Sequence, residues 1–450
     1  MANSYLSRTI SSAGSLTTWT FSAWVKLSEP GTSNCAIFSQ GSSGNNVTSI
    51  FFNHSNGAHR LEWRQYENSY TARKTTNRAF SDKSGWYHIV CQWDSTNGTA
   101  GDRMKIYVNG ERETSFENST DPSSSLSSII NSTTGTMHIG TYWNTSSNLF
   151  NGYMSHVTFV NNAIVAPTSF GQADSTTGQW KFKSPSGITF GTNGFHLKME
   201  NSGALGTDSS GNSNTFTVNG NLKQALDTPS NVYATLNPLN VPTSNAPTFA
   251  NGNTTSTTPG SSGRFGGTST LGMSAGKYYW EAKYVISGLP RGEFGVSYDP
   301  GEQARNNATA SNYADAWCYQ SEGGHIRNNN SNLDQEATYT NGDIVMCALD
   351  LTNNKIYFGK NGTWVNSGDP TSGASGTGAY SVTADKTYFT ITSDNTSGSD
   401  QQTYQFNFGN GFFGTTAITS AGSNGNGSLF EYDCPSGYYA LNTKNINTYG

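Results

Sequence analysis

The chain has 450 residues and a formal net charge of −5, and charged and aromatic residues each make up 12% of it. Lys and Arg are too few and too scattered to give the basic surface that nucleic acid requires, so we predict no nucleic-acid partner. The densest basic stretch, Arg60 to Arg78, is interrupted by Glu62 and Glu67, and we interpret it as a solvated strand face. No apolar run is long enough to cross a bilayer, so no membrane insertion is predicted.

Composition also indicates the fold class. The chain has 50 glycines and many Ser, Thr and Asn residues among its aromatic β-formers, which predicts an all-β protein with long polar loops. Its length favours two or three domains. Five cysteines without C-x-x-C spacing argue against a disulfide framework, and Cys91 and Cys347 are expected to be buried free thiols. The first residues lack the apolar core of a secretion signal, so we expect synthesis in a reducing cytoplasm.

Residues 1–175 are predicted to form one module of short strands with apolar residues at alternate positions. The expected strands are Trp19–Leu27, Trp86–Trp93, Met104–Val108, Met137–Trp143 and Tyr153–Val160. The third strand ends at Asn109-Gly110, a strong hairpin signal because both residues tolerate positive φ. No helical period interrupts the strands, which favours a two-sheet β-sandwich.

The segments WTFSAWVK, GWYHIVCQWD, RMKIYVNGE, MHIGTYW and FNGYMSHVTFVNNAI, in this order, resemble the laminin-G-like, concanavalin A-type jelly roll. The resemblance covers nearly all of residues 1–175. It implies binding of carbohydrate or protein through loops at the sandwich rim or along the concave sheet. The related glycosidases carry a Glu-x-Asp-x-x-Glu strand whose alternate carboxylates face one cleft. This chain has no such strand, so a hydrolase of that type is disfavoured.

Residues 176–265 are predicted to be a connector with short strands, because prolines break the pattern and residues 251–263 are almost wholly Asn, Thr, Ser, Gly and Pro. The stretches GFHLKMENSGALGTDSSGNSNTFTVNG and DTPSNVYATLNPL resemble a connector in structural proteins of marine tailed phages. The tail, residues 419–450, contains DCPSGYYALNT, which is similar to the C-termini of such proteins. Tyr438, Tyr439 and Leu441 are expected to dock this tail onto a core or a neighbouring subunit.

A second β domain is predicted over residues 266–418. Its expected strands are Lys277–Tyr284, Glu293–Ser297, Ile344–Leu351, Lys355–Phe358, Tyr388–Ile391 and Tyr404–Phe408. Both faces of Ile344–Leu351 are apolar, so this strand is expected to be buried between two layers. The next strand leads to Asn361-Gly362, a second hairpin turn. The segments GKYYWE, GEFGVSYD, GDIVMCALDLTNNKIYFGKNG and FNFGN resemble the SPRY domain, which implies a curved β-sandwich that binds protein partners through its loops.

Motifs for cofactors and metal ions are weak. The spacing Gly409-x-Gly411-x-x-Gly414 matches a dinucleotide fingerprint, but no βαβ unit follows it, so we interpret it as a turn and predict no cofactor. Asp94 and Asp102 flank a Gly-rich loop, and the laminin-G resemblance implies that such domains hold calcium at the rim. The alternative is a solvated loop with turn-forming aspartates.

Loop aromatics are the stronger binding candidates. Tyr142 and Trp143 lead into the polar loop that begins at Asn144, and Trp317 and Tyr319 are predicted to lie in a polar insertion. Flat aromatic faces stack on sugar rings, and neighbouring amides and hydroxyls orient the sugar. The alternative is that these aromatic residues are core or intersubunit contacts.

These features together predict a non-enzymatic virion protein of a tailed phage, made in the host cytoplasm. We expect it to be a tail fibre, spike or head decoration that binds a glycan or protein of the host surface. A homotrimer is favoured by analogy with fibres. Two alternatives remain: a capsid or tail component that binds mainly other virion proteins, and a polysaccharide depolymerase with an unrecognised site.

Overall fold

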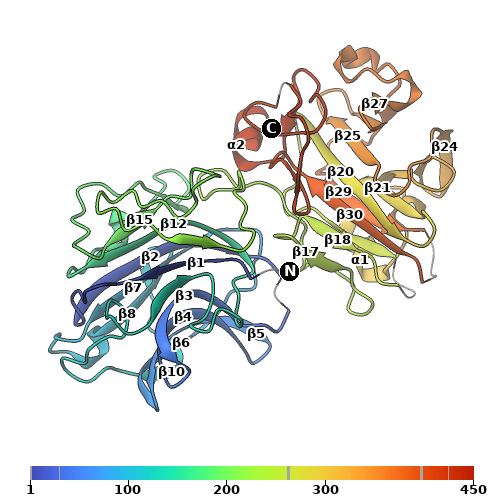
Figure 1. Ribbon diagram of the computed structural model, residues 1–450. Helices are drawn as coiled ribbons and strands as arrows, with labels where there is room; N and C mark the ends of the chain where they lie inside the picture. Colours follow the sequence, from blue (N-terminus) through green and yellow to red (C-terminus); the bar gives the residue numbers. More distant parts are fainter. Residues whose placement is uncertain (1–2, 30, 261–263, 396–398, 424) are drawn as a thin grey trace. The chain divides into compact units, whose positions relative to one another are not determined.

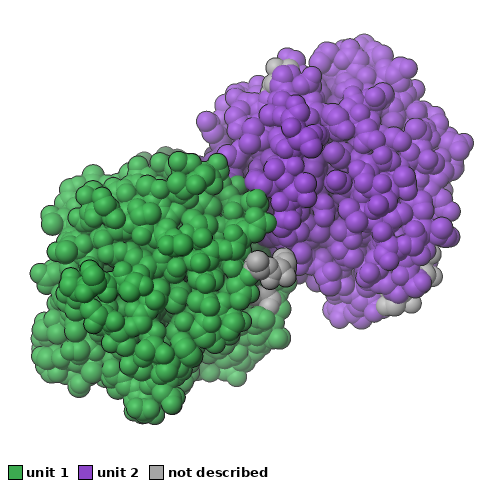
Figure 2. Space-filling model, viewed as in Figure 1, with its two compact units in different colours: residues 1–224 green, residues 225–450 purple. Residues whose placement is uncertain are grey.

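The computed structural model describes residues 3–29, 31–260, 264–395, 399–423 and 425–450. Strands make up 43% of the chain and helices 7%, which confirms the predicted all-β class. The chain divides into two compact units, residues 1–224 (unit 1) and residues 225–450 (unit 2), coloured separately in Figure 2. Among the described residues, no helix has the length and apolar character that crossing a membrane requires.

Unit 1 is a sandwich of two antiparallel sheets (Figure 1). The larger sheet has eight strands in the order β10-β6-β5-β4-β3-β11-β1-β16, and the smaller has six in the order β15-β12-β2-β7-β8-β9. The strands are β1 (Tyr5–Thr9), β2 (Thr18–Leu27), β3 (Cys35–Ser43), β4 (Asn46–Ser55), β5 (Ala58–Glu67), β6 (Tyr70–Ala79), β7 (Tyr87–Asp94), β8 (Met104–Val108), β9 (Glu111–Arg112), β10 (Phe116–Thr120), β11 (Thr136–Ile139), β12 (Gly152–Asn161), β15 (Phe195–Leu197) and β16 (Thr217–Asn219).

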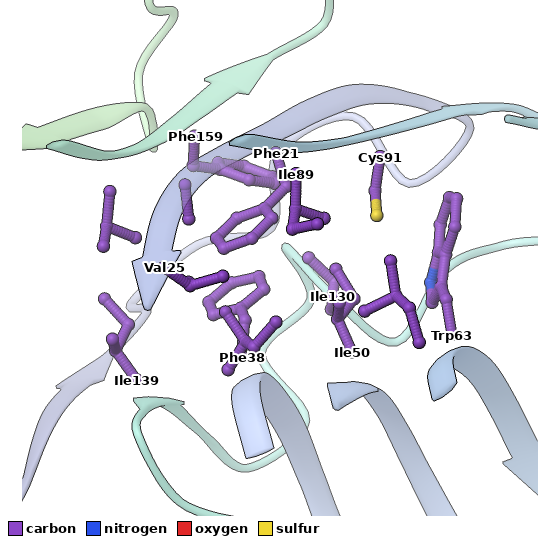
Figure 3. Packing of buried hydrophobic residues seen from close by; sticks show 14 of the residues in the cluster. Phe21, Val25, Phe38, Ile50, Trp63, Ile89, Cys91, Ile130, Ile139 and Phe159 are labelled. Atoms are coloured by element: carbon purple, nitrogen blue, oxygen red, sulfur yellow. The ribbon is translucent and has the colours of Figure 1, made fainter. Parts of the chain in front are cut away.

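The two sheets enclose one hydrophobic core, part of which Figure 3 shows. The alternate residues of β2 from Trp19 to Leu27 are fully buried there, as the period-two pattern predicts. Across the core, the rings of Phe21 and Phe38 stack with their centroids 4.7 Å apart. Cys91 is buried in the same core, and all five cysteines of the chain are buried free thiols, which confirms the prediction for Cys91 and Cys347.

The outer face of the six-stranded sheet is covered by the chain itself. Residues 163–190, which we call the strap, contain the hairpin of β13 (Gly171–Ala173) and β14 (Trp180–Phe182). The Trp180 indole Nε1 donates a hydrogen bond of 3.1 Å to Nδ1 of His88, whose other ring nitrogen lies 2.9 Å from the Ser22 hydroxyl. Phe182 stacks on His156 with ring centroids 3.8 Å apart. The strap therefore rests on histidines of the sheet.

The stretch predicted as a connector is divided between the two units. β15 pairs with β12 and β16 pairs with β1, so residues near 195 and 218 complete the sheets of unit 1. β18 (Thr255–Thr257) extends a sheet of unit 2 by pairing with β30, and β17 (Thr248–Ala250) pairs with β18 at the edge of that sheet. Proline and polar residues in this stretch therefore accompany edge strands, which such residues tolerate.

Unit 2 is a second antiparallel sandwich with one short parallel pairing (Figure 1). Its nine-stranded sheet has the order β17-β18-β30-β20-β25-β26-β27, with β28 paired to β26 and β33 to β20, and its six-stranded sheet has the order β19-β29-β21-β22-β23-β24. The elements are β19 (Phe265–Thr268), β20 (Lys277–Ser287), β21 (Gly292–Ser297), α1 (Pro300–Asn306), β22 (Ala316–Gln320), β23 (His325–Asn328), β24 (Ser331–Gln335), β25 (Ile344–Asp350), β26 (Lys355–Lys360), β27 (Thr363–Trp364), β28 (Tyr380–Ser381), β29 (Phe389–Asp394), β30 (Gln401–Asn407), β31 (Phe412–Phe413), β32 (Thr416–Ala417), β33 (Tyr439–Ala440) and α2 (Thr443–Tyr449).

Strand β25 is buried on both faces, as predicted. Val345, Cys347 and Leu349 face the main core between the sheets, whereas Met346 and Ala348 face a second apolar cluster. The C-terminal segment covers that second cluster, to which it contributes Tyr438, while Leu441 reaches the main core. The expectation that the tail docks onto a core is thus confirmed within unit 2 for Tyr438 and Leu441, whereas Tyr439 stacks on Tyr449 of α2 with ring centroids 3.6 Å apart.

Both predicted Asn-Gly turns have the expected backbone. Asn109 and Gly110 have φ values of 50° and 83°, and Asn361 and Gly362 have φ values of 49° and 83°. Positive φ at both central residues matches the twist of a two-residue hairpin. The second turn joins β26 to β27 and lies beside the Tyr432 ring, which leaves room for no side chain at Gly362.

Candidate functional site

One face of the eight-stranded sheet of unit 1 points away from the core and carries aromatic and charged side chains. Along β5, Glu62, Arg64 and Tyr66 alternate with residues of the core side such as Leu61 and Trp63. Phe51 on β4 and Tyr142 pack together beside them, with Trp143 against the same cluster. We call Phe51, Arg64, Tyr66, Tyr70, Tyr142 and Trp143 the aromatic–arginine face.

Arg64 lies at the centre of this face. Its guanidinium carbon is 4.8 Å from the ring centroid of Phe51 and 5.8 Å from that of Tyr142. A third ring, that of Tyr70, lies 6.0 Å away. Nη2 of Arg64 donates a hydrogen bond of 3.1 Å to the Tyr142 hydroxyl. Such cation–π contacts fix the guanidinium, and 21% of the Arg64 side chain remains exposed to solvent.

A buried carboxylate supports the arginine from beneath. Glu62 has no exposed side-chain surface, and its Oε2 accepts hydrogen bonds from Arg73 at 2.9 Å and from Asn53 and Thr75 at 3.0 Å each. Its Oε1 lies 3.4 Å from Nη1 of Arg64. A buried charge requires such partners. Burial acts to lower the pKa of Arg64, but the interactions of the guanidinium with the Tyr142 hydroxyl and with the carboxylate of Glu62 outweigh burial and raise the pKa.

The loop after β11 brings two predicted residues onto this face. Gly140 has a φ of 84°, which turns the chain after the strand, and Tyr142 and Trp143 follow. Asn144 is used inside the loop, because its Oδ1 accepts a hydrogen bond of 2.8 Å from the Ser147 hydroxyl. The structure therefore unites Tyr142 and Trp143 with Arg64, while Asn144 shapes the loop that presents them.

The other two predicted aromatic residues do not form a surface site. Trp317 and Tyr319 belong to strand β22 rather than to a polar insertion, and they are 6% and 0% exposed. Both are part of the main core of unit 2, where Tyr319 lies 4.9 Å from Tyr339 between ring centroids. Polar residues on either side of a short strand hid its alternation. The prediction that these two rings stack on a sugar is therefore wrong, and the core alternative holds.

The predicted calcium ligands have other partners. Asp102 forms an ion pair of 2.6 Å with Arg112, and Oδ1 of Asp94 accepts a hydrogen bond of 2.6 Å from the Thr96 hydroxyl. Among the residues that the structure describes, no group of three or more His, Cys, Asp or Glu side chains is arranged to hold a metal ion. The geometry favours the alternative of turn-forming aspartates in a polar loop.

Sequence reasoning missed Arg64, Phe51, Tyr66 and Tyr70. Arg64, Tyr66 and Tyr70 lie within the stretch interpreted as a solvated strand face, whereas Phe51 lies on the preceding strand β4. That interpretation holds for the backbone, since Arg60 to Arg78 does span β5 and β6. The alternation of Glu62, Arg64 and Tyr66 on one side of a strand was the available signal, but a single strand does not show which rings its neighbours contribute.

Two family models match the chain. Residues 2–168 match the concanavalin A-like lectin/glucanases superfamily, and residues 277–411 match the SPRY domain. The chain carries a concanavalin A-like domain followed by a SPRY domain. The first match contains the whole aromatic–arginine face, and the second contains β20 to β30, so both expected domain families are confirmed.

Solved structures are similar to parts of the chain. The SPRY domain of human HERC1 is 21% identical with a TM-score of 0.27, and the match covers 33% of this chain and 86% of that one. A putative carbohydrate-binding protein from Bacteroides ovatus is 16% identical with a TM-score of 0.30, over 51% of this chain and 62% of that one. A heptameric pentraxin from Limulus polyphemus is 18% identical with a TM-score of 0.27, over 36% and 72%.

Proposed function

We propose that the aromatic–arginine face binds carbohydrate and that the chain is a non-enzymatic binding protein. The observation that carries the proposal is Arg64, held among three aromatic rings above the buried Glu62 with part of its side chain open to solvent. Aromatic faces stack on sugar rings, and a guanidinium donates to hydroxyl or carboxylate oxygens. The match of this unit to a superfamily that includes lectins supports the proposal.

A glycan array with the full chain tests the proposal, followed by titration of the best glycan. Replacing Trp143 by Ala removes a half-buried ring from the loop and should weaken binding about 5-fold, which corresponds to about 1 kcal/mol of stacking. Tyr142→Phe should also weaken it, because Arg64 loses a hydrogen-bond partner. Tyr313→Ala, in unit 2, is the matched control and should not change affinity. Absence of any glycan bound by the wild type, or equal affinity in all variants, contradicts the proposal.

We further propose that the protein is part of a phage particle, as a fibre, spike or decoration that attaches to a host-surface glycan or protein, with a trimer favoured. The support is the resemblance of the connector and C-terminal segments to phage structural proteins. Mass spectrometry of purified particles and electron microscopy of their surface test this assignment. Light scattering that shows a monomer, together with absence from particles, contradicts it.

The SPRY match favours a second function, because resemblance to this domain implies binding of protein partners through its loops. In this alternative the chain is a capsid or tail component whose contacts are mainly with other virion proteins. An empty glycan array together with density bonded into the shell or tail lattice favours it. Release of reducing ends from host polysaccharide by the purified protein supports a depolymerase instead and contradicts the non-enzymatic assignment.

A further inference from the structure

Unit 2 contains a cavity of about 290 Å³ beside the Asn361-Gly362 turn. Strand β27 and two stretches of the C-terminal segment line it, and the residues are Met346, Gly362, Trp364, Ser420, Ala421, Gly422, Glu431, Tyr432 and Asp433. Its size is at the lower end of the range for small-molecule sites, which fits a headgroup rather than a chain of sugars. The cavity belongs to the SPRY domain and its C-terminal cover and is independent of the carbohydrate proposal.

Two aromatic side chains form the walls, and both are held in place. Trp364 packs edge-on against Tyr279 and Tyr357, with ring centroids 6.1 and 6.5 Å apart. The backbone N–H of Tyr432 donates a hydrogen bond of 2.8 Å to the buried carboxylate of Glu281, and the Tyr432 ring lies against Gly362. Met346, which is 1% exposed, belongs to the apolar cluster on the outer face of β25 and contributes an apolar floor. The two aromatic walls are therefore held in place, and polar groups of the C-terminal segment line the rest of the cavity.

The cavity has a negative potential. Glu431 and Asp433 line it, and its described lining residues include no Lys, Arg or His. Burial, followed by the nearby charges of Glu431, Glu281 and Asp343, raises the pKa of Tyr432, which reflects the same field. A cation is favoured in such a site, and an anion is disfavoured.

The carboxylates are already engaged in hydrogen bonds with the adjacent loop. Glu431 accepts hydrogen bonds from both the backbone N–H and the hydroxyl of Thr419. Oδ1 of Asp433 accepts from the N–H and hydroxyl of Ser423, at 2.7 and 2.9 Å. Each carboxylate keeps its negative charge and has acceptor positions beyond those that the loop uses. A quaternary ammonium makes no hydrogen bonds, so it uses this charge without competing for the loop contacts.

We propose that this cavity binds a trimethylammonium group. Its methyl groups contact Trp364, Tyr432 and Met346, and its charge is stabilised by the two aromatic faces and by the carboxylates of Glu431 and Asp433. The group is shared by choline, by choline lipids and by trimethylated lysine. The structure assigns the chemistry of this headgroup to unit 2, which is a binding site of another class from the face of unit 1.

The proposal is tested by titrating the full chain with choline chloride and measuring binding by calorimetry and by tryptophan fluorescence. Choline should bind at least about 10-fold more tightly than 3,3-dimethylbutanol, its neutral isostere, because the neutral molecule has neither the cation–π contacts nor the attraction to the carboxylates. Ethanolamine and hexoses should bind more weakly than choline. Equal binding of choline and its neutral isostere, stronger binding of a hexose, or no saturation up to about 50 mM choline overturns the proposal.

Variants identify the site. Trp364→Leu should weaken choline binding at least about 5-fold, whereas Trp364→Phe, which keeps an aromatic face, should restore most of it. Glu431→Gln should weaken binding about 3-fold, and Glu302→Gln, which removes a carboxylate outside the cavity, should not. Circular dichroism melts verify that each variant folds. Unchanged binding in a folded Trp364→Leu variant overturns the assignment.

The source of the group is resolved with three probes of the wild-type chain. The first probe is choline itself. The second is a peptide with trimethylated lysine, compared with its unmethylated form, and the third is vesicles of phosphatidylcholine, compared with vesicles of phosphatidylglycerol. Preference for each trimethylammonium member supports the headgroup, and the tightest member identifies the partner. Equal binding of the methylated and unmethylated peptides, together with no binding of choline, contradicts the proposal. Loss of glycan binding in unit 1 leaves these outcomes unaffected.

Discussion

Three histidines beneath the strap, of which His88 and His196 are buried and His156 is half-buried, make unit 1 sensitive to acid. His88 is fully buried between Trp24 and Trp180, and His156 lies 3.3 Å from His196 between their ring nitrogens. Burial lowers the pKa of His88 to about 3. Burial lowers the pKa of His156 and His196 to about 4, helped at His156 by the neighbouring His196 and at both by Lys198, although Asp208 and Glu200 act in the opposite direction on His196.

These pKa values set the direction and size of the effect. Each folded-state pKa is below the unfolded value of 6.5, so the stabilisation is complete above pH 6.5 and is lost as the pH falls toward 4. At pH 5 the imidazole is protonated in the unfolded state but stays neutral in the folded state. Because pH 5 is about 1.5 units below the unfolded pKa, each histidine lowers the free energy of unfolding by about 2 kcal/mol. His156 and His196 titrate as a coupled pair, so the three histidines together give roughly 4–6 kcal/mol, comparable to the whole stability of many domains.

Urea denaturation at pH 8 and pH 5, with limited proteolysis to locate the cleavage sites, measures this loss. We expect the strap, residues 163–190, to be cut first at pH 5, because its docking depends on the Trp180–His88 and Phe182–His156 contacts. The double variant His156→Gln, His196→Gln should retain only the share of His88, about 2 kcal/mol. An equal urea midpoint of unit 1 at both pH values, or a pH dependence unchanged in the double variant, refutes the reasoning.

Three further predictions concern buried groups and one turn. Burial raises the pKa of Glu281 to about 7, so its stabilisation is complete below pH 4.5 and lost as the pH rises through 7; urea melts of unit 2 should show about 3 kcal/mol less stability at pH 8 than at pH 4.5. Glu62→Gln leaves Arg64 without its buried counter-charge and should lower the free energy of unfolding of unit 1 by about 3 kcal/mol in urea melts. Gly362→Ala places a Cβ 2.9 Å from the Tyr432 ring at a φ of 83° and should lower the free energy of unfolding of unit 2 by about 1–2 kcal/mol. Gly342→Ala is the control, because Gly342 also has a positive φ but lies in open space, so this variant measures the backbone strain alone.

The scaffold was predictable from the sequence because its signals are local. Alternation along Trp19–Leu27 and Ile344–Leu351 identified buried strands, and Asn109-Gly110 and Asn361-Gly362 identified their turns. The apolar second face of β25 even predicted that another layer covers it, which the C-terminal segment does. Period and turn chemistry are properties of a few consecutive residues, so no knowledge of partners was needed.

The candidate sites were only partly predictable because they depend on which strands are neighbours. Tyr142 and Trp143 were found as aromatic residues next to a polar loop, but Arg64 joins them only through the order β5-β4-β3-β11 in the sheet. The same criterion failed for Trp317, since a buried strand flanked by polar segments has the same local pattern as an exposed loop. Trp364 and Tyr432 are 68 residues apart in sequence, and only the C-terminal cover brings them to one cavity.

Each unit positions a surface by means of a fully buried glutamate. Glu62 accepts hydrogen bonds from Arg73, Asn53 and Thr75 under the aromatic–arginine face. Glu281 accepts the backbone N–H groups of Glu431 and Tyr432, at 2.9 and 2.8 Å, under the wall of the cavity. Burying a carboxylate is unfavourable unless every partner is in place, so each glutamate restricts its surface to one arrangement. The proposed binding surfaces of both units therefore depend on buried supports within the sheets, and polar loop composition alone is a weak guide to where such surfaces lie.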